Sequence, residues 1–343
     1  MKYILLRYPR YPTINLGNDI QTIAVENLLA QLGVERSDML FLHRDCLGDY
    51  RGEEAICVMQ GWFANGHEWL PPQRIRPVFN GFHLSDKLYT FCRAKSVSAS
   101  LKRHEPIGCR DKKTMQFFDS IGVAAYFSRC LTLTLPSRDK SSQAKKVFLV
   151  NVPPKLRRYI PKDIAEGAEE IDQKYVYTND DDDAWKEYLS QARCLLARYR
   201  EEAALVVTSA LHCAAPCTAM GIPVVLLNPN PTHRSYLRFQ AIDDIIPVYN
   251  VYDLERSRVN WSPTPPDIED LKRDMTENLR RTCFGTFENE LYDEELMDLR
   301  RRIGAKRESF GTNRPGVAVD RRWFRRGARF LRRMARSAIG NRT

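Results

Sequence analysis

The chain has 343 residues, more than a single ordinary hydrophobic core supports, so two domains are expected. Hydrophobic residues make up 43% and charged residues 28% of the sequence, which excludes a disordered chain. The net charge is +10, but residues 321–343 hold nine arginines and no acidic residue, which leaves +1 for all the others. The basic character is therefore confined to a tail.

The N-terminal half alternates apolar segments with turns and helices. Segments 2–8, 53–60, 75–83 and 105–110 predict strands, and helices are predicted over 20–33 and 111–121. Asp111 is the expected N-cap of the second helix and Gly122 its end. Strands that alternate with helices predict a parallel sheet with helices on both faces.

After a polar stretch over 136–146, which is the best candidate for a domain boundary, the same pattern resumes. Strands are predicted over 147–150, 205–208, 224–227 and 245–248, and 266–306 is predicted to be helical. We therefore predict two Rossmann-like α/β domains that face a shared cleft. The predicted domains are 1–140 and 141–308, followed by a linker and basic amphipathic tail over 309–343.

The most apolar stretch, "EEAALVVTSALHCAAPCTAMGIPVVLLNPN", has the length of a membrane span, but Pro216 and the Gly221–Pro223 region interrupt it. It is better interpreted as a strand, a turn, a helix over 211–220 and a second strand. His212 then lies where the helix begins, a position that attracts anions and where an imidazole can donate to an anion or exchange a proton. The alternative is a core histidine bonded to a backbone carbonyl.

Arg110 occupies the equivalent position in the first half, between a predicted strand and the helix capped by Asp111. A guanidinium group matches carboxylates and phosphates with two parallel hydrogen bonds. The alternative is an arginine that pairs locally with Asp111 or lies on the surface. Because Arg110 and His212 come from different halves and both follow a strand, we expect them to meet across the cleft and to bind a small anion.

Three segments carry a resemblance to a known family: "INLGNDIQTIAVENLL", "PIGCRDKKTMQFFDSIGVAAYFSRCLTLTL" and "VVTSALHCAAPCTAMGIPVV". In this order they resemble the polysaccharide pyruvyl transferase family over about residues 1–300. The resemblance implies a fold like that of two-domain GT-B glycosyltransferases. It also implies transfer of a pyruvyl group from phosphoenolpyruvate, as donor substrate, onto a sugar as a ketal during exopolysaccharide or cell-surface glycan synthesis.

By this resemblance, Arg110 and His212 hold the phosphate and carboxylate of the donor, and they are also the catalytic candidates. Ser209 lies in the same turn as the histidine. Family members often carry a lysine downstream, where this chain offers Arg234 and Arg238, and an arginine two residues before the histidine, where this chain has alanine. The chemistry needs a positioned acid–base group and paired cations, and neither a metal nor a further cofactor is expected.

The residues expected to contact the acceptor sugar follow strand ends or open a helix. Asn18 and Asp19 precede the first helix, although capping is an equally good interpretation of both. Trp62 follows a strand and can stack on a sugar ring, with a buried aromatic side chain as the alternative. His83 closes another predicted strand.

The nine cysteines form no CxxC pair and no signal peptide is visible, which predicts a cytoplasmic protein with reduced thiols. On a helix, residues 321–343 would carry an aromatic apolar face and an arginine-rich face, the pattern of an interfacial membrane helix. We expect peripheral binding to the anionic inner face of the cytoplasmic membrane, where a lipid-linked oligosaccharide acceptor would be found. Nucleic acid is not an expected partner, although nucleic-acid binding and a disordered solubilising tail stay open as alternatives.

Two other functions are compatible with the sequence. The first is a nucleotide-sugar-dependent glycosyltransferase with the same two-domain fold. The second is a non-catalytic protein whose basic tail binds a membrane or nucleic acid.

Overall fold

A computed structural model describes residues 1–8, 13–64, 66–139, 144–176, 184–230, 237–285 and 293–307. The chain divides into two compact units, Met1–Ser309 and Phe310–Thr343, and the described residues all belong to the first. The predicted linker and tail over 309–343 lie outside the described residues.

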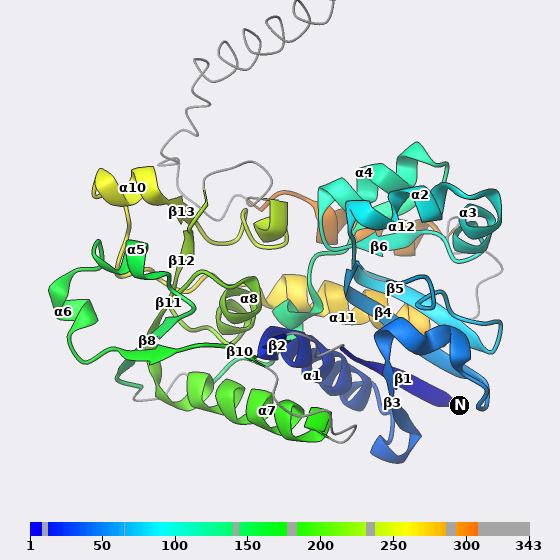
Figure 1. The fold of residues 1–343 in the computed structure, drawn as a ribbon, viewed down its shortest axis with the longest axis horizontal. Helices are drawn as coiled ribbons and strands as arrows, with labels where there is room; N and C mark the ends of the chain where they lie inside the picture. Colours follow the sequence, from blue (N-terminus) through cyan, green and yellow to red (C-terminus); the bar gives the residue numbers. More distant parts are fainter. Residues whose placement is uncertain are drawn as a thin grey trace, which may run out of the picture. The chain divides into compact units, whose positions relative to one another are not determined.

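The N-terminal sheet has six parallel strands in the order β3-β1-β4-β5-β6-β7 (Figure 1). Its central strands are buried along almost their whole length, as expected for parallel strands covered on both faces. The strand β3 is not among the predicted strands. The strands are β1 (Lys2–Arg7), β3 (Met39–His43), β4 (Ala55–Phe63), β5 (Ile75–Leu84), β6 (Ile107–Cys109) and β7 (Ala125–Phe127).

The helices of this half are α1 (Leu16–Gln31), α2 (Tyr89–Arg93), α3 (Lys95–Lys102) and α4 (Lys112–Ser120). The helix α4 begins as predicted, because Asp111 Oδ1 accepts from the Thr114 amide at 2.9 Å, and Gly122 follows its end with φ +71°. The helix α1 begins earlier than predicted, because the Asn15 side chain accepts from the Gly17 amide at 3.0 Å and caps it there.

The C-terminal sheet has five parallel strands in the order β13-β12-β11-β8-β9. The strand predicted over 245–248 begins only at Val248. Ile245 and Ile246 are buried in the turn before it, where both amides bond to Ile242 O, so their burial produced the apolar pattern without a strand. The strands are β8 (Lys146–Val150), β9 (Glu169–Ile171), β11 (Ala203–Thr208), β12 (Val224–Asn228) and β13 (Val248–Asn250).

The helices around the second sheet are α5 (Pro154–Arg157), α6 (Lys162–Ala165), α7 (Ala184–Glu202), α8 (Leu211–Ala219) and α10 (Val251–Glu255). The two sheets confirm the predicted α/β fold with two Rossmann-like domains. Short 3₁₀ helices connect several elements: η1 (Arg36–Asp38), η2 (Arg44–Asp49), η3 (Asp86–Leu88), η4 (Leu131–Thr134) and η5 (Leu237–Phe239).

The chain passes between the two halves more than once. The strand β2 (Thr13–Asn15) pairs antiparallel with β10 (Lys174–Val176), and α1 packs against α7 and α8. The last helices, α11 (Glu269–Phe284) and α12 (Glu294–Gly304), return to the N-terminal sheet, where they contact β5 and β7 (Figure 1). The domain boundary near residue 140 stays a prediction.

Arg129 joins these returning segments. Its side chain is fully buried and donates to both carboxylate oxygens of Asp244, at 2.6 and 2.8 Å, and to the carbonyls of Ala241, Ile303 and Ala305. Its φ of 62° lies in the left-handed region, which is uncommon for a residue other than glycine. The bidentate ion pair therefore ties the end of β7 to the second half of the chain.

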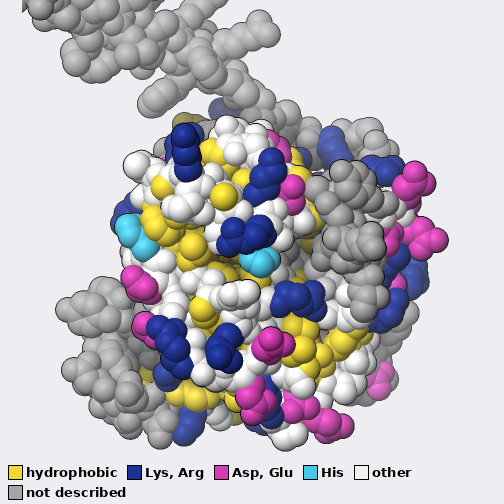
Figure 2. All heavy atoms as spheres, turned by 90° about the vertical axis from the view of Figure 1, so that its right-hand side faces the viewer, with side chains coloured by type: hydrophobic (Ala, Val, Ile, Leu, Met, Phe, Trp, Pro, Cys, Tyr) yellow, Lys and Arg dark blue, Asp and Glu magenta, His cyan; other side chains and the backbone are white. Residues whose placement is uncertain are grey.

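Figure 2 shows one face of the molecule, on which Lys and Arg side chains are spread among uncharged and hydrophobic ones, with Asp and Glu more toward the edges. Single hydrophobic side chains on a surface are ordinary. Within the described ranges, we find no helix both long and apolar enough to cross a membrane.

Candidate anion-binding site at two strand-to-helix turns

Arg110 is held at the end of β6 by the sheet itself. Phe82 and Cys109 are register partners on β5 and β6, and the Arg110 amide donates to Phe82 O at 2.8 Å. The side chain, only 7% exposed, places Nη1 3.2 Å from Gln21 Oε1 and 3.3 Å from His212 Nε2. The arginine and the histidine predicted from separate halves of the chain are therefore in direct contact.

His212 lies in the first turn of α8, with a non-helical backbone at φ −85° and ψ 23°. The helix α1 comes close to it at Gly17, where a Cβ atom would lie only 2.9 Å from His212 Cβ and 3.3 Å from Nδ1. Real Cβ atoms do not come this close to another carbon. A glycine at position 17 is thus what allows α1 to lie against the histidine.

The neighbours of His212 determine its protonation. A guanidinium group can only donate, so His212 Nε2 accepts from Arg110 and the proton of the neutral ring lies on Nδ1. Burial lowers the pKa of His212 well below its usual value, and the charges of Arg110 and Arg238 lower it further. At neutral pH this imidazole is uncharged and keeps one N–H to donate.

A second arginine and an unpaired hydroxyl complete the turn before α8. Arg238 Nη2 donates to Ser209 O, and its guanidinium stands 4.4 Å from the centre of the Phe239 ring. Ser209 is 5% exposed, and its Oγ has no hydrogen-bond partner within the described part of the chain. The first amides of a helix also lack intrahelical partners. This turn therefore offers several hydrogen-bond donors, at the positive end of the helix dipole.

His83 and Trp62 extend the site along the N-terminal sheet. They are register partners near the ends of β5 and β4, so Trp62, His83 and Arg110 follow one another across three neighbouring strands. Trp62 is 49% exposed, which excludes the buried-aromatic interpretation, and His83 Nδ1 contacts Asp111 Oδ2. Trp62 and His83 therefore lie along the sheet edge that carries Arg110.

Comparison with known proteins decides the family. Residues 15–231, more than half of the chain, match the family described as "Polysaccharide pyruvyl transferase". The chain belongs to the polysaccharide pyruvyl transferase family.

The family match includes both strand-to-helix turns and ends before Arg234 and Arg238. Among solved structures, a protein from Klebsiella pneumoniae subsp. pneumoniae NTUH-K2044, described as uncharacterized, is 14% identical, with a TM-score of 0.39 over 69% of this chain and 86% of that chain. No curated protein matches the chain.

Other residues predicted for a pyruvyl transferase site are placed differently. Asn18 and Asp19 lie inside the first turn of α1 rather than in a loop before it, and Asp19 is only 6% exposed. Asn15, not either of these residues, caps the helix through its side chain. Arg234 lies outside the described residues, and so do residues 321–343.

Three residues of this candidate site were not predicted: Gln21, Gly17 and Asp111, the last as a partner of His83. Gln21 is 1% exposed and lies one turn after Gly17 on an otherwise apolar helix face. That periodicity is the one sequence signal available for it, because a polar residue on a buried helix face requires a partner.

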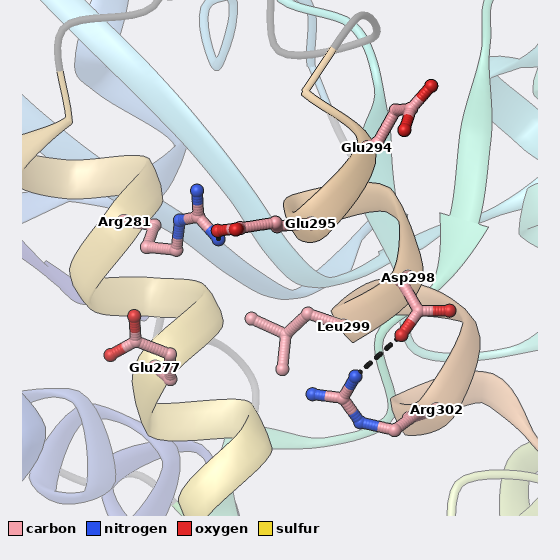
Figure 3. Close-up of a pocket in the computed structure, with 7 residues that line it drawn as sticks. All are labelled: Glu277, Arg281, Glu294, Glu295, Asp298, Leu299 and Arg302. Atoms are coloured by element: carbon pink, nitrogen blue, oxygen red, sulfur yellow. Dashed lines mark hydrogen bonds and ion pairs between the residues drawn. The ribbon is translucent and has the colours of Figure 1, made fainter.

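The described residues contain no group of three or more His, Cys, Asp or Glu side chains that could hold a metal ion, and all nine cysteines are free thiols. A surface hollow of about 400 Å³ lies elsewhere, between α11 and α12 (Figure 3). Two ion pairs join its lining residues, Arg302–Asp298 at 2.7 Å and Arg281–Glu295 at 3.3 Å, and none of the lining residues belongs to the site above.

Proposed function

We propose that this protein transfers the pyruvyl group of phosphoenolpyruvate onto two hydroxyls of a sugar as a cyclic ketal, during assembly of an exopolysaccharide or cell-surface glycan. The contact between Arg110 and His212 carries the proposal. Arg110 has only neutral partners, Gln21 and His212, among the described residues. A buried cation that forms no ion pair with a carboxylate in the described part of the chain is suited to an anion supplied from outside.

Phosphoenolpyruvate carries a carboxylate and a phosphate on adjacent parts of a small molecule. The guanidinium of Arg110 can bind either group bidentately, and the Nδ1–H of His212 can donate to the same anion. The turn before α8 adds the Ser209 hydroxyl, the first helix amides and the nearby Arg238. These donors support a bound trianion better than a neutral sugar.

The reaction adds one sugar hydroxyl across the C2=C3 bond of the donor, with its oxygen bonding to C2 and a proton to C3. The C2–O bond to phosphate then breaks, and a second hydroxyl bonds to C2. Positive charge develops at C2 in both steps, and negative charge develops on the leaving phosphate. Arg110 and Arg238 stabilise that phosphate because cations already in place need no reorganisation during the reaction.

The acceptor sugar would lie on the side of the N-terminal sheet. The exposed ring of Trp62 can stack on a pyranose, and its register partner His83 lies between it and Arg110. Asn18 and Asp19 are further candidates. They follow Gly17 in the first turn of α1, and Gly17 lies against His212.

A titration calorimetry experiment tests the proposal. Wild-type protein is titrated with phosphoenolpyruvate and, separately, with a panel of nucleoside diphosphates. We expect saturable phosphoenolpyruvate binding that weakens at least about 30-fold in Arg110→Ala and in His212→Ala, because each removes one partner of a buried polar contact. Arg103→Ala and His104→Gln, which change the same residue types away from the site, serve as matched controls.

Binding of nucleoside diphosphates alone would replace the proposal by the glycosyltransferase alternative. Asp244, one of the two acids suited to hold a ribose hydroxyl, is already paired with Arg129. Binding of neither ligand by folded protein would leave the non-catalytic alternative.

We further propose that residues 321–343 attach the enzyme to the anionic cytoplasmic face of a membrane, where a lipid-linked acceptor would be presented. The support is their sequence alone, with nine arginines and an interleaved apolar pattern. Sedimentation with anionic vesicles is expected for the full chain and not for a chain that ends at residue 320. Equal sedimentation of both, or a salt-dependent preference for nucleic acid, would contradict this role.

A further inference from the structure

His83 and Asp111 form a fixed pair next to the anion-binding turns. Asp111 Oδ2 contacts His83 Nδ1 and accepts from Thr114 Oγ1 at 2.9 Å, while Oδ1 accepts from the Thr114 amide at 2.9 Å. The Asp111 side chain is only 4% exposed. A carboxylate held by three contacts at a helix N-terminus has little freedom to move, so it fixes the orientation of the imidazole.

This pairing determines which nitrogen of His83 carries the proton. A carboxylate accepts, so Nδ1 donates to Asp111 and the lone pair of the neutral ring lies on Nε2. No hydrogen-bond partner of Nε2 is found in the described ranges of the chain, and the His83 side chain is 25% exposed. His212 has the opposite arrangement, because its Nε2 lone pair is already taken by Arg110.

Burial, more than the surrounding charges, keeps the pKa of His83 below its usual value. Burial lowers the pKa of His83, the Asp111 carboxylate raises it, and the cations of Arg110 and Lys113 lower it again, with a net value below the usual one. Across the site, His212 on α8 is also neutral, since burial and both nearby arginines lower its pKa. His83 is thus an unprotonated base with an open nitrogen.

We propose that His83 is the proton shuttle of pyruvyl transfer and that Asp111 is the residue that positions it. This inference rests on the proposed function. In the first step, the C2=C3 electron pair bonds to a proton at C3, which becomes the methyl group, and the sugar oxygen bonds to the electron-poor C2 in the same step. His83 Nε2 accepts the proton of the attacking hydroxyl and supplies the proton that C3 takes up.

In the second step, the C2–O bond to phosphate breaks and the second hydroxyl bonds to C2. His83 Nε2 accepts that hydroxyl's proton and returns it to the departing phosphate. One hydroxyl proton therefore ends on the methyl group, the other leaves on inorganic phosphate, and His83 is neutral again. No oxidant, reductant or further reactant is needed.

The sequence makes His212 a catalytic candidate as well, but its surroundings make it less suited than His83 to carry protons. Its only free N–H lies on Nδ1, and its two guanidinium neighbours oppose any gain of a proton. The two histidines therefore have different roles: His212 binds the donor, and His83 transfers protons.

The test compares phosphoenolpyruvate affinity with the rate of phosphate release in the presence of methyl β-D-galactopyranoside, methyl β-D-glucopyranoside and cell-envelope glycan. His83→Gln is expected to bind phosphoenolpyruvate within about 3-fold of wild type and to turn over about 10²–10⁴-fold more slowly. His104→Gln is the matched control with unchanged affinity and rate. A His83→Gln variant that turns over like wild type would overturn the inference.

Asp111→Asn provides a readout that a purely structural role would not change. Asparagine can still cap α4, but it lacks the negative charge that raises the pKa of His83. The acid limb of the rate–pH profile should therefore move to lower pH, together with a smaller fall in rate than in His83→Gln. An unmoved acid limb would contradict the pairing.

The outcomes for this inference and for the proposed function are distinct. Wild-type protein that neither binds phosphoenolpyruvate nor releases phosphate overturns the function, and the shuttle with it. Wild-type turnover with a His83→Gln variant of unchanged rate overturns the shuttle alone. A His83→Gln variant that loses donor affinity as strongly as His212→Ala would make His83 a donor-binding residue instead.

Discussion

Arg110 and Arg129 are two buried arginines that occur at the ends of neighbouring strands, yet they have opposite surroundings. Arg129 is fully buried and bonded to both oxygens of Asp244 and to three backbone carbonyls. Arg110 is 7% exposed and contacts only a glutamine and a histidine among the described residues. Both reach residues of the second half of the chain.

The presence or absence of a paired carboxylate distinguishes a structural arginine from one that can bind a ligand. An arginine with a carboxylate of its own is neutralised inside the protein, so it contributes to holding the two halves together. Arg110 instead donates to two neutral acceptors and forms no ion pair with a carboxylate among the described residues, so its charge is available for a ligand. Burial alone would not have distinguished the two side chains.

The largest expected effect is on stability. Arg129→Met should lower the free energy of unfolding by about 3–5 kcal/mol, because it leaves the Asp244 carboxylate buried without its cation. Arg110→Met removes a cation that is not ion-paired with any carboxylate of the described ranges, so we expect a change within about 1 kcal/mol in either direction. Urea unfolding of both variants measures the contrast.

If Arg110→Met destabilised the protein as much as Arg129→Met, the two arginines would share a structural role. The double change Arg129→Met with Asp244→Leu is a useful control, since removal of both charges together should recover part of the loss.

A smaller effect is expected at Gly17, which touches no ligand in this account. Gly17→Ala should improve helix propensity by about 1 kcal/mol, but its Cβ would meet His212 Cβ at 2.9 Å and push the ring away from Arg110. We predict about 10-fold weaker phosphoenolpyruvate binding by calorimetry. Gln31→Ala, at the exposed end of the same helix, is the control, and equal affinities in the two variants would show that the contact is unimportant.

The smallest effect concerns pH. His83, His104 and His212 all have pKa values below the ordinary 6.5 in the folded protein. Below pH 6.5 the unfolded chain therefore binds more protons than the folded one. The contribution of these three histidines to the free energy of unfolding is complete above that pH and is lost as the pH falls. The slope is at most about 1.4 kcal/mol per pH unit for each histidine.

Urea unfolding between pH 7.5 and 5.5 measures this slope, and His212→Gln should make it shallower. A protein that became more stable over this range as the pH fell would show that His212 gains a proton on folding, contrary to its place between two guanidinium groups.

The contact between Arg110 and His212 was predictable because it depends on topology. Both residues follow parallel strands, and the carboxyl ends of such strands are where α/β domains present their side chains. The fold followed from the same alternation of apolar and helical segments. The family resemblance then supplied the donor, which no spacing of residues indicates.

The remaining contacts were not predictable, because they join residues that no local pattern links. Nothing in the sequence near His83 shows that Asp111 will lie against it, since the cap position of Asp111 already accounts for an acid there. The Arg129–Asp244 pair and the approach of Gly17 to His212 likewise depend on how distant elements pack. The strand predicted at 245–248 was wrong at its start because buried isoleucines in a turn have the same composition as a strand.

The most direct test of the central claim is a crystal structure of the protein grown with phosphoenolpyruvate. We predict that the carboxylate or phosphate of the ligand lies within hydrogen-bonding distance of both the Arg110 guanidinium and His212, near the start of α8. Phosphoenolpyruvate bound away from both residues, with the contact between Arg110 and His212 unchanged, would contradict it.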